Sequence, residues 1–461
     1  MKNVIVEVAR FVIILLVTVY TLYGFTAFLK KNPKKQKHFY RVQGVLLYTN
    51  HFACNLVLYL NTGNVKVLEF YLAQVAFILG FSILYPLCYK RISRGIMNHM
   101  MMLFSISFVM LARISFDSAW RQFAMASIAM GICLVVPAII KKVSFLQKLW
   151  WIYCLLGIGL LMYVELYGVT VYGAKNWVKI AGTSIQPSEF VKILFVFFAA
   201  AALYKTTKFS HVFWISGAAA LHILILAAER DLGAALILFL TYVIMLYIAT
   251  GKSVYLFGGL ASGSVAAVVA YYLFPHVQVR VTAWLDPWAS IENSGYQVAQ
   301  SLFAIGTGGW FGMGIGKGLP TSIPVGKSDF IFAAISEEMG AICALWVMLI
   351  YVSCFTLFIT IALKMKDNFY KLVALGLSVM FIVQVFLSIG GVTKFIPSTG
   401  VTLPLVSYGG SSVLSTVMVF SIMQGLYLLN WNEEDKIEKE KRRVRRTGQK
   451  QGVPTIKEVE S

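Results

Sequence analysis

The chain has 461 residues, of which 59% are hydrophobic and only 13% charged, and its mean hydropathy is +0.75. These values exclude an ordinary soluble domain and predict an all-α polytopic membrane protein, because lipid forces backbone polar groups into helices. The formal charge of +20 does not indicate nucleic acid, since the basic residues lie mostly in short loops and the tail, where topology and anionic headgroups explain them.

Thirteen apolar runs recur along the chain, and we interpret each as a membrane span. They fall at 8–29, 43–62, 65–89, 98–114, 122–141, 146–170, 187–205, 211–228, 231–250, 253–274, 331–363, 370–392 and 411–431. The first is long for a signal-peptide core and continues into Lys30 and Lys31, so we expect a retained span. The six cysteines lie within apolar runs without metal-site spacing and predict neither disulfides nor zinc.

Short basic segments follow every second run, for example at 30–41, 90–94, 204–208 and 364–371. If every run crosses the membrane, these segments share one side, which the positive-inside rule makes the cytoplasm. Three polar intervals then lie on the external face, at 171–187, 275–330 and 393–410. The mixed-charge tail at 432–461 is expected to be cytoplasmic, basic and disordered.

The first polar interval ends at Pro187 and Ser188, which resemble a helix start. Glu189 and Lys192 follow, three residues apart and therefore on neighbouring positions of one helix face. Because charges inside a membrane are costly and usually paired, we expect this pair inside the bundle. The alternative is a capped span with Trp177 as an interfacial anchor.

Two further acidic groups have open interpretations. The triplet Glu229, Arg230 and Asp231 lies at a turn between two runs, where it is either solvated or lines a cavity. Glu337 and Glu338 lie one to two turns into the next span and point in different directions, so one is expected to be structural and the other to face a cavity.

Irregular segments flank these spans. The interval 397–412 is rich in turn formers and hydroxyl side chains, which predicts irregular backbone around a protein-lined cavity at membrane depth. The glycines at 312–318 follow no strand of a βαβ unit, so they predict a tight or movable loop rather than a phosphate-binding site. The interval 275–330 is the longest polar break and therefore the first place to look for catalytic chemistry.

Six segments, in their order and spacing, resemble the signature segments of the SEDS family of FtsW-, RodA- and SpoVE-like proteins. They are GAKNW at 173–177, QPSEFVK at 186–192, DLGAA at 231–235, GYQVAQSLFAIGTGG at 295–309, SDFIFAAISEEMG at 328–340 and PSTGVTLPLVSYGGSS at 397–412. The resemblance covers 98–431 and implies a ten-helix bundle. Residues 1–97 add about three transmembrane helices of unknown purpose.

The resemblance implies a peptidoglycan glycosyltransferase that polymerises lipid II at the external face of a bacterial cytoplasmic membrane, in cell division or cell-shape maintenance. It also implies a class B penicillin-binding transpeptidase as partner. No cofactor is certain, no metal ligands are assigned, and a divalent cation at the diphosphate is left open. The residues assigned to substrate binding are Lys175, Trp177, Gln186, Ser188, Glu189, Lys192, Asp231, Lys327, Asp329, Lys394 and Ser407.

The catalytic base is where the chain departs from the family. The family commonly has an acidic residue five positions before the glycine of the GY pair, and counting back from Gly295 gives Ser290. A serine without a partner base accepts a proton poorly near neutral pH. Asp286 and Glu292 are the nearest substitutes, although Asp286 before proline is also a common helix cap.

Two other departures concern cations. Asn176 stands where the family often has arginine before the tryptophan, and the adjacent Lys175 can supply the charge without the bidentate geometry. Lys394 stands where a small residue is expected and adds a candidate phosphate contact.

Three functions are therefore compared: an active polymerase, a non-catalytic protein that binds lipid II or holds a transpeptidase in place, and a lipid II flippase. The flippase lacks a visible inverted repeat.

Overall fold

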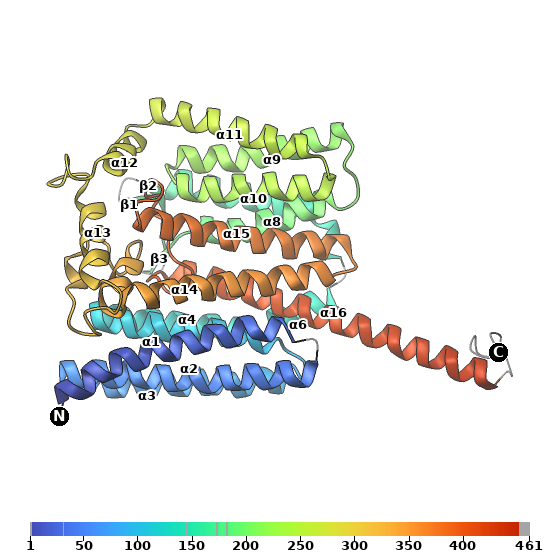
Figure 1. Ribbon diagram of the computed structural model, residues 1–461. Coiled ribbons are helices and arrows are strands. Elements are labelled where there is room, and N and C mark those ends of the chain that lie inside the picture. Colours follow the sequence, from blue (N-terminus) through green and yellow to red (C-terminus); the bar gives the residue numbers. More distant parts are fainter. Residues whose placement is uncertain (1, 31, 144, 172–173, 181–182, 451–461) are drawn as a thin grey trace.

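The computed structural model describes residues 2–30, 32–143, 145–171, 174–180 and 183–450, and almost all regular structure in them is helical. The helices are α1 (Lys2–Phe28), α2 (Pro33–Thr62), α3 (Val65–Cys88), α4 (Arg94–Ile114), α5 (Phe116–Cys133), α6 (Val136–Lys142), α7 (Trp150–Tyr167), α8 (Ser188–Leu203), α9 (Phe209–Ala228), α10 (Leu232–Thr250), α11 (Ser253–Leu273), α12 (Pro275–Leu285), α13 (Tyr296–Gly308), α14 (Ile331–Lys364), α15 (Asn368–Val392) and α16 (Gly410–Lys450). The long helices lie side by side in one bundle (Figure 1).

Every apolar run predicted as a span coincides with a helix, and the run at 122–141 is divided between α5 and α6. Eleven helical segments of the described chain are long and apolar enough to cross a membrane. The two other predicted runs form α2, which carries several buried polar side chains, and α8, which has only 16 residues but is buried along most of its length. The protein is therefore an all-α polytopic membrane protein, as predicted.

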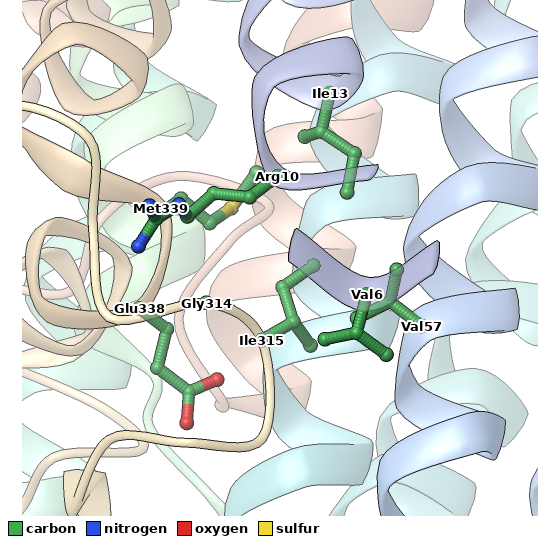
Figure 2. Close-up of a pocket in the computed structure, with 8 residues that line it drawn as sticks. All are labelled: Val6, Arg10, Ile13, Val57, Gly314, Ile315, Glu338 and Met339. Atoms are coloured by element: carbon green, nitrogen blue, oxygen red, sulfur yellow. The ribbon is translucent and has the colours of Figure 1, made fainter. Parts of the chain in front are cut away.

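The three N-terminal helices form a layer on one side of the bundle, where α1 packs on α2 and α14, and α2 packs on α4 (Figure 1). As a result α4 is buried along almost its whole length. At its N-terminal end α1 meets the segment 309–318, where Ile315 lies beside Val6 and Val57 (Figure 2).

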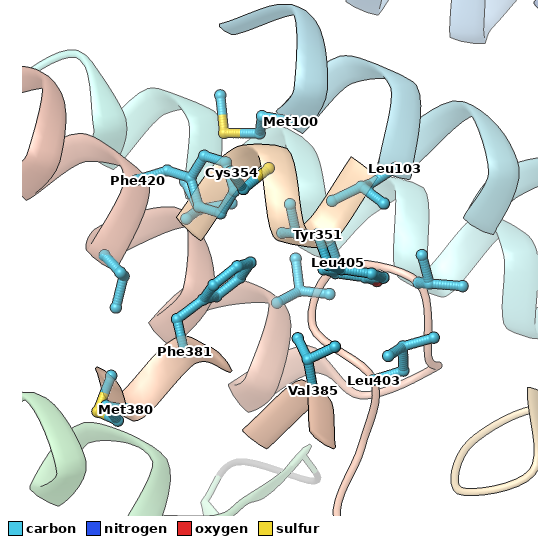
Figure 3. Packing of buried hydrophobic residues seen from close by; sticks show 14 of the residues in the cluster. Met100, Leu103, Tyr351, Cys354, Met380, Phe381, Val385, Leu403, Leu405 and Phe420 are labelled. Atoms are coloured by element: carbon cyan, nitrogen blue, oxygen red, sulfur yellow. The ribbon is translucent and has the colours of Figure 1, made fainter. Parts of the chain in front are cut away.

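The centre of the bundle is filled by apolar side chains from α4, α14, α15 and α16 together with the segment 403–405 (Figure 3). Phe381 contacts Phe358 and Phe420 with ring centroids 5.4 and 5.6 Å apart. The Tyr351 hydroxyl donates to the Pro404 carbonyl at 2.7 Å, so the irregular segment is fixed to α14 by a buried hydrogen bond. The irregular backbone predicted for 397–412 is thus present, and its segment 403–405 is packed against the apolar centre.

The three polar intervals lie at the same end of the bundle, opposite the end from which α16 extends (Figure 1). In the first, β1 (Val169–Val171), β2 (Ala174–Ile180) and β3 (Thr183–Ile185) form an antiparallel sheet in the order β1-β2-β3, with Val169 opposite Trp177 and Val178 opposite Ile185. In the second, 275–330 contains α12 and α13. Chain segments far apart in sequence thus meet at one end.

The helix α14 is broken near this end at Gly340, whose φ is 86°. A Cβ at Gly340 would lie 2.4 Å from the amide nitrogen of Gly312, so only glycine allows this close approach. Gly312, Gly314 and Gly316 also have positive φ, and the loop they form is tightly folded, as the sequence indicated.

The helix α16 continues to Lys450, through the first part of the tail that the sequence indicated as disordered. The segment NEEDKIEKEKRRVRR consists largely of strong helix formers with opposite charges at helical spacing, and these favour continuation of the helix. Residues 451–461 lie outside the described residues.

Candidate active site

Asp231 is the centre of a hydrogen-bond cluster at the end of the bundle that carries the polar intervals. Its Oδ2 accepts hydrogen bonds from Asn176 Nδ2 at 3.0 Å, Gln186 Nε2 at 3.1 Å and Ser188 Oγ at 3.1 Å. Its Oδ1 accepts from the amide of Ala234 at 3.1 Å and so caps α10. One carboxylate therefore joins β2, the start of α8 and the start of α10.

Glu189 and Lys192 form the predicted buried pair. Their side chains approach to 3.0 Å and are 8% and 3% exposed. Ser415 Oγ on α16 donates to Glu189 at 2.7 Å, and Lys192 Nζ donates to Gln384 Oε1 on α15 at 2.8 Å. Such a pair persists in a low-dielectric interior because each charge has the other and a further polar partner.

Arg280 and Asp329 form a second charged group, and the sequence interpretation assigned no role to Arg280. The position of a Cβ on Gly400 would be 3.6 Å from Arg280 Nη2 and 3.7 Å from Asp329 Oδ2, so both side chains face the same point. Burial raises the pKa of Asp329 to about 6, although Arg280 and Ser328 both oppose the shift. Burial also lowers the pKa of Arg280, while Asp329 and Asp231 raise it.

This geometry brings the three polar intervals together. Arg280 and Asp329 come from 275–330, Gly400 from 393–410, and Asp231, which interacts electrostatically with Arg280, binds side chains from 171–188. The signal that could have indicated Arg280 was its isolation, because no other Asp, Glu, Lys or Arg occurs in its segment PHVQVRVTAWL. The Arg280 guanidinium, at the polar end of the membrane bundle, is a group that forms charge-assisted hydrogen bonds with phosphate.

Lys175 lies in a separate charged cluster. Its Nζ donates to the carbonyl of Glu165 and its amide donates to the carbonyl of Glu229 at 2.9 Å. The Glu229 side chain is fully buried, and neither carboxylate oxygen has a hydrogen-bond partner among the described residues. The structure therefore decides between the two interpretations of the triplet: Glu229 is buried, whereas Arg230 is exposed at φ 61°.

Glu229 provides a pH prediction. Burial, with Asp231 and Glu165 nearby, raises its pKa from 4.5 to about 8, and Lys175 opposes the shift. Between these two values of the pH, the folded state retains a proton on Glu229 that the unfolded state releases. The contribution of this proton to the free energy of unfolding is therefore fully present below about pH 4.5 and is lost as the pH rises through about 8. Between about pH 5.5 and about pH 8.5, the melting temperature of the wild type in detergent should fall several degrees more than that of Glu229→Gln. Parallel curves for the two proteins would contradict the prediction.

The candidate bases lie in the turns between α12 and α13. Asp286 is exposed, and its Oδ1 accepts from the amides of Trp288 at 3.0 Å and Ala289 at 3.2 Å, so it caps its own turn. Ser290 Oγ is buried without a hydrogen-bond partner in the described chain. Glu292 is exposed, and it makes no hydrogen bond or ion pair with any residue that the structure describes. Of the two carboxylates, Glu292 alone has both oxygens free.

The remaining predicted residues are more dispersed. Lys327 Nζ lies 5.2 Å from the ring centroid of Tyr408 and donates to Ser118 Oγ at 3.3 Å. Ser407 Oγ donates to the carbonyl of Ser328 at 2.6 Å, which places its segment beside Asp329. The contact of Lys327 with Tyr408 and that of Ser407 with Ser328 both join 275–330 to the segment 393–410.

The side chains of Lys394 and Trp177 make no such hydrogen bonds in the described chain. Lys394 has φ 58°, and its carbonyl accepts a hydrogen bond from Trp284 Nε1 at 3.1 Å. Trp177 is half-buried in β2, opposite Val169. Neither side chain is brought to Asp231 by a hydrogen bond in the described part of the chain.

The fold and site define a multi-pass membrane protein with a charged centre built from irregular segments at one end of its bundle. The family model for FtsW, RodA and SpoVE, described as a cell cycle protein, matches residues 90–428. The chain belongs to this family. The match leaves residues 1–89, which include α1–α3, outside it.

Individual relatives are similar over different lengths. The peptidoglycan glycosyltransferase RodA of Mycobacterium tuberculosis is 38% identical over 267 residues, which cover 54% of this chain and 57% of the relative. The chain thus spans little more than half the length of this relative. Stage V sporulation protein E of Bacillus subtilis is 35% identical over 323 residues, covering 67% of this chain and 86% of that protein.

Solved structures share the fold. A chain of a peptidoglycan synthase complex superposes with a TM-score of 0.61 at 23% identity, covering 74% of this chain and 98% of that chain. The rod shape determining protein RodA of Thermus thermophilus superposes with a TM-score of 0.53 at 21% identity, covering 75% of this chain and 98% of its own. About a quarter of this chain therefore lies outside an otherwise complete family fold.

Proposed function

We propose that the protein is a peptidoglycan glycosyltransferase that polymerises lipid II at the external face of the cytoplasmic membrane. The observation that carries the proposal is the convergence of Arg280, Asp329 and Asp231, from separate polar segments, at one end of the membrane bundle. The names of the relatives support the reaction. The basic connections at the opposite end support an external position for the site.

The proposed reaction joins two lipid-linked sugars. A base removes a proton from the acceptor sugar hydroxyl, whose oxygen then bonds to the anomeric carbon of the donor sugar. The bond from that carbon to the diphosphate breaks, and its electron pair leaves with the phosphate oxygen. We assign stabilisation of this developing charge to the cations Arg280 and Lys192, with Lys175, Lys327 and Lys394 as further candidates.

A divalent cation at the diphosphate remains an additional candidate. Among the residues that the structure describes, no three His, Cys, Asp or Glu side chains are grouped so that they could hold a metal ion. The residues present therefore do not fit a metal held by the protein alone, and the proposed step uses side-chain cations.

We assign the base to Glu292, because Asp286 uses one oxygen to cap its own turn and Ser290 is a buried hydroxyl. With lipid II and purified protein, Glu292→Gln should lower the polymerisation rate at least about 100-fold, the range for loss of a general base. Asp286→Asn keeps the capping oxygen and should stay within about tenfold of wild type. A Glu292→Gln variant as active as wild type would refute the assignment and turn attention to Asp329.

The second candidate is a non-catalytic member that binds lipid II or holds a transpeptidase in place. It is favoured by Ser290 at the expected acidic position and by the capping role of Asp286. Wild-type protein, purified with a class B transpeptidase, would then make no glycan under conditions in which a relative with Asp at that position does. Glycan made by wild type, and lost in Glu292→Gln, would exclude this candidate.

A transpeptidase partner is part of the proposal. Its support is that a solved chain of the same fold comes from a complex that coordinates polymerisation and crosslinking. Co-purification of the full chain with a class B penicillin-binding protein from the same membrane would test the pairing.

A further inference from the structure

The loop 309–318 connects α13 to the segment that carries Asp329, and the family core holds it on one side. The amides of Met313 and Gly314 donate to the carbonyls of Glu337 and Glu338, both at 2.9 Å. The Glu338 carboxylate accepts from the Gly316 amide at 3.1 Å and from Arg113 Nε at 2.8 Å. This side of the loop thus rests on the broken start of α14.

The added N-terminal helices hold the opposite side. Arg10 Nη1 on α1 donates to the Gly312 carbonyl at 2.9 Å, and Asn61 Nδ2 near the end of α2 donates to the Ile315 carbonyl at 2.5 Å. Glu7 forms an ion pair with Lys317. Two different helices therefore bind carbonyl groups only three residues apart in one loop.

Apolar packing accompanies these polar contacts. Ile315 is buried and lies against Val6, Ile13 and Val57, where it lines a small pocket that also includes Arg10 and Met339 (Figure 2). The rings of Phe11 and Phe311 are 5.5 Å apart. The loop is therefore enclosed between α1, α2 and α14.

We infer that α1 and α2 position this loop for the reaction, with Arg10 and Asn61 as positioning residues. The inference rests on the proposed function. The inference goes beyond the proposed function because the family model matches residues 90–428 and leaves α1 and α2 outside the match. A loop bound on both sides has less conformational freedom, so the segment leading to Lys327 and Asp329 is held in one arrangement before substrate binds.

Two measurements on the full-length chain test the inference, and the first needs no activity. Hydrogen exchange of the amides at 309–318 should rise at least about fivefold in Arg10→Ala/Asn61→Ala, while exchange in α15 stays unchanged. In lipid II polymerisation, kcat should fall about tenfold with KM within about twofold of wild type, because the loop is displaced rather than the substrate contacts removed.

Matched variants complete the design. Lys66 is an exposed lysine at the start of α3, shortly after Asn61 in the chain, and it makes no contact with the loop. Lys66→Ala therefore removes a nearby cation and should behave as wild type. Arg10→Lys keeps a donor for the Gly312 carbonyl and should recover part of kcat. The two single alanine variants are measured alongside, so that a misfolded double variant does not remove the test.

Unchanged exchange at 309–318 would overturn the inference, and so would raised exchange with unchanged kcat. If wild type makes no glycan, the proposed function fails instead. Exchange then decides by itself whether the helices hold the loop.

Discussion

Lys192→Met is expected to lower the rate of lipid II polymerisation about 100- to 1,000-fold. The substitution removes a buried cation and leaves Glu189 without its ion-pair partner in an interior where only Ser415 still donates to it. Breaking a buried pair in this way costs about 3–5 kcal/mol of stability, so folding must be measured with activity.

The double variant Glu189→Gln/Lys192→Met separates the two effects. It leaves no uncompensated charge and should recover the melting temperature of the wild type without recovering activity. Lys252→Met is the control, because Lys252 is an exposed lysine in a connection at the opposite end of the bundle. A Lys192→Met protein that polymerises lipid II at the wild-type rate would remove Lys192 from the site.

Asp231→Ala is expected to lower the polymerisation rate at least about 100-fold. Three side chains lose their common acceptor, and β2 and the start of α8 are no longer joined to α10 through it. The free energy of unfolding should fall by at least about 2 kcal/mol, since a helix cap is lost together with hydrogen bonds to a charged group.

Asp367→Ala provides a matched control for the cap. Asp367 begins α15 at the other end of the bundle, where its Oδ1 accepts from the amides of Phe369 and Tyr370. Asp367→Ala should lower the free energy of unfolding by about as much as the loss of the helix cap does in Asp231→Ala. It should leave the polymerisation rate unchanged. If both aspartate variants lose activity equally, the effect of Asp231 is one of stability alone.

Local sequence signals predicted the helices and one part of the site. Each apolar run coincides with a helix, because the backbone polar groups of a segment in lipid must form their hydrogen bonds within that helix. The spacing of Glu189 and Lys192 predicted their pairing, since residues three apart are neighbours on a helix whatever surrounds it. The glycines at 312–316 predicted a tight loop, which their positive φ angles confirm.

Local signals failed where the outcome depended on a neighbour distant in sequence. The triplet at 229–231 was interpreted as either solvated or lining a cavity, and tertiary packing divides it, because Glu229 is buried while Arg230 is exposed. Arg280 received no role, because its neighbours along the chain are apolar and its charged neighbours, Asp329 and Asp231, come from other segments.

The sequence by itself thus determined the class of protein, its spans, its family and the pair Glu189–Lys192, all of which follow from composition or from spacing within one segment. Only the tertiary structure decided which charged side chains lie close together, that Asp286 caps its own turn, and that α1 and α2 form hydrogen bonds with the loop 309–318. The physical reason is that helical periodicity is set by neighbouring residues, whereas contacts between segments depend on how helices pack.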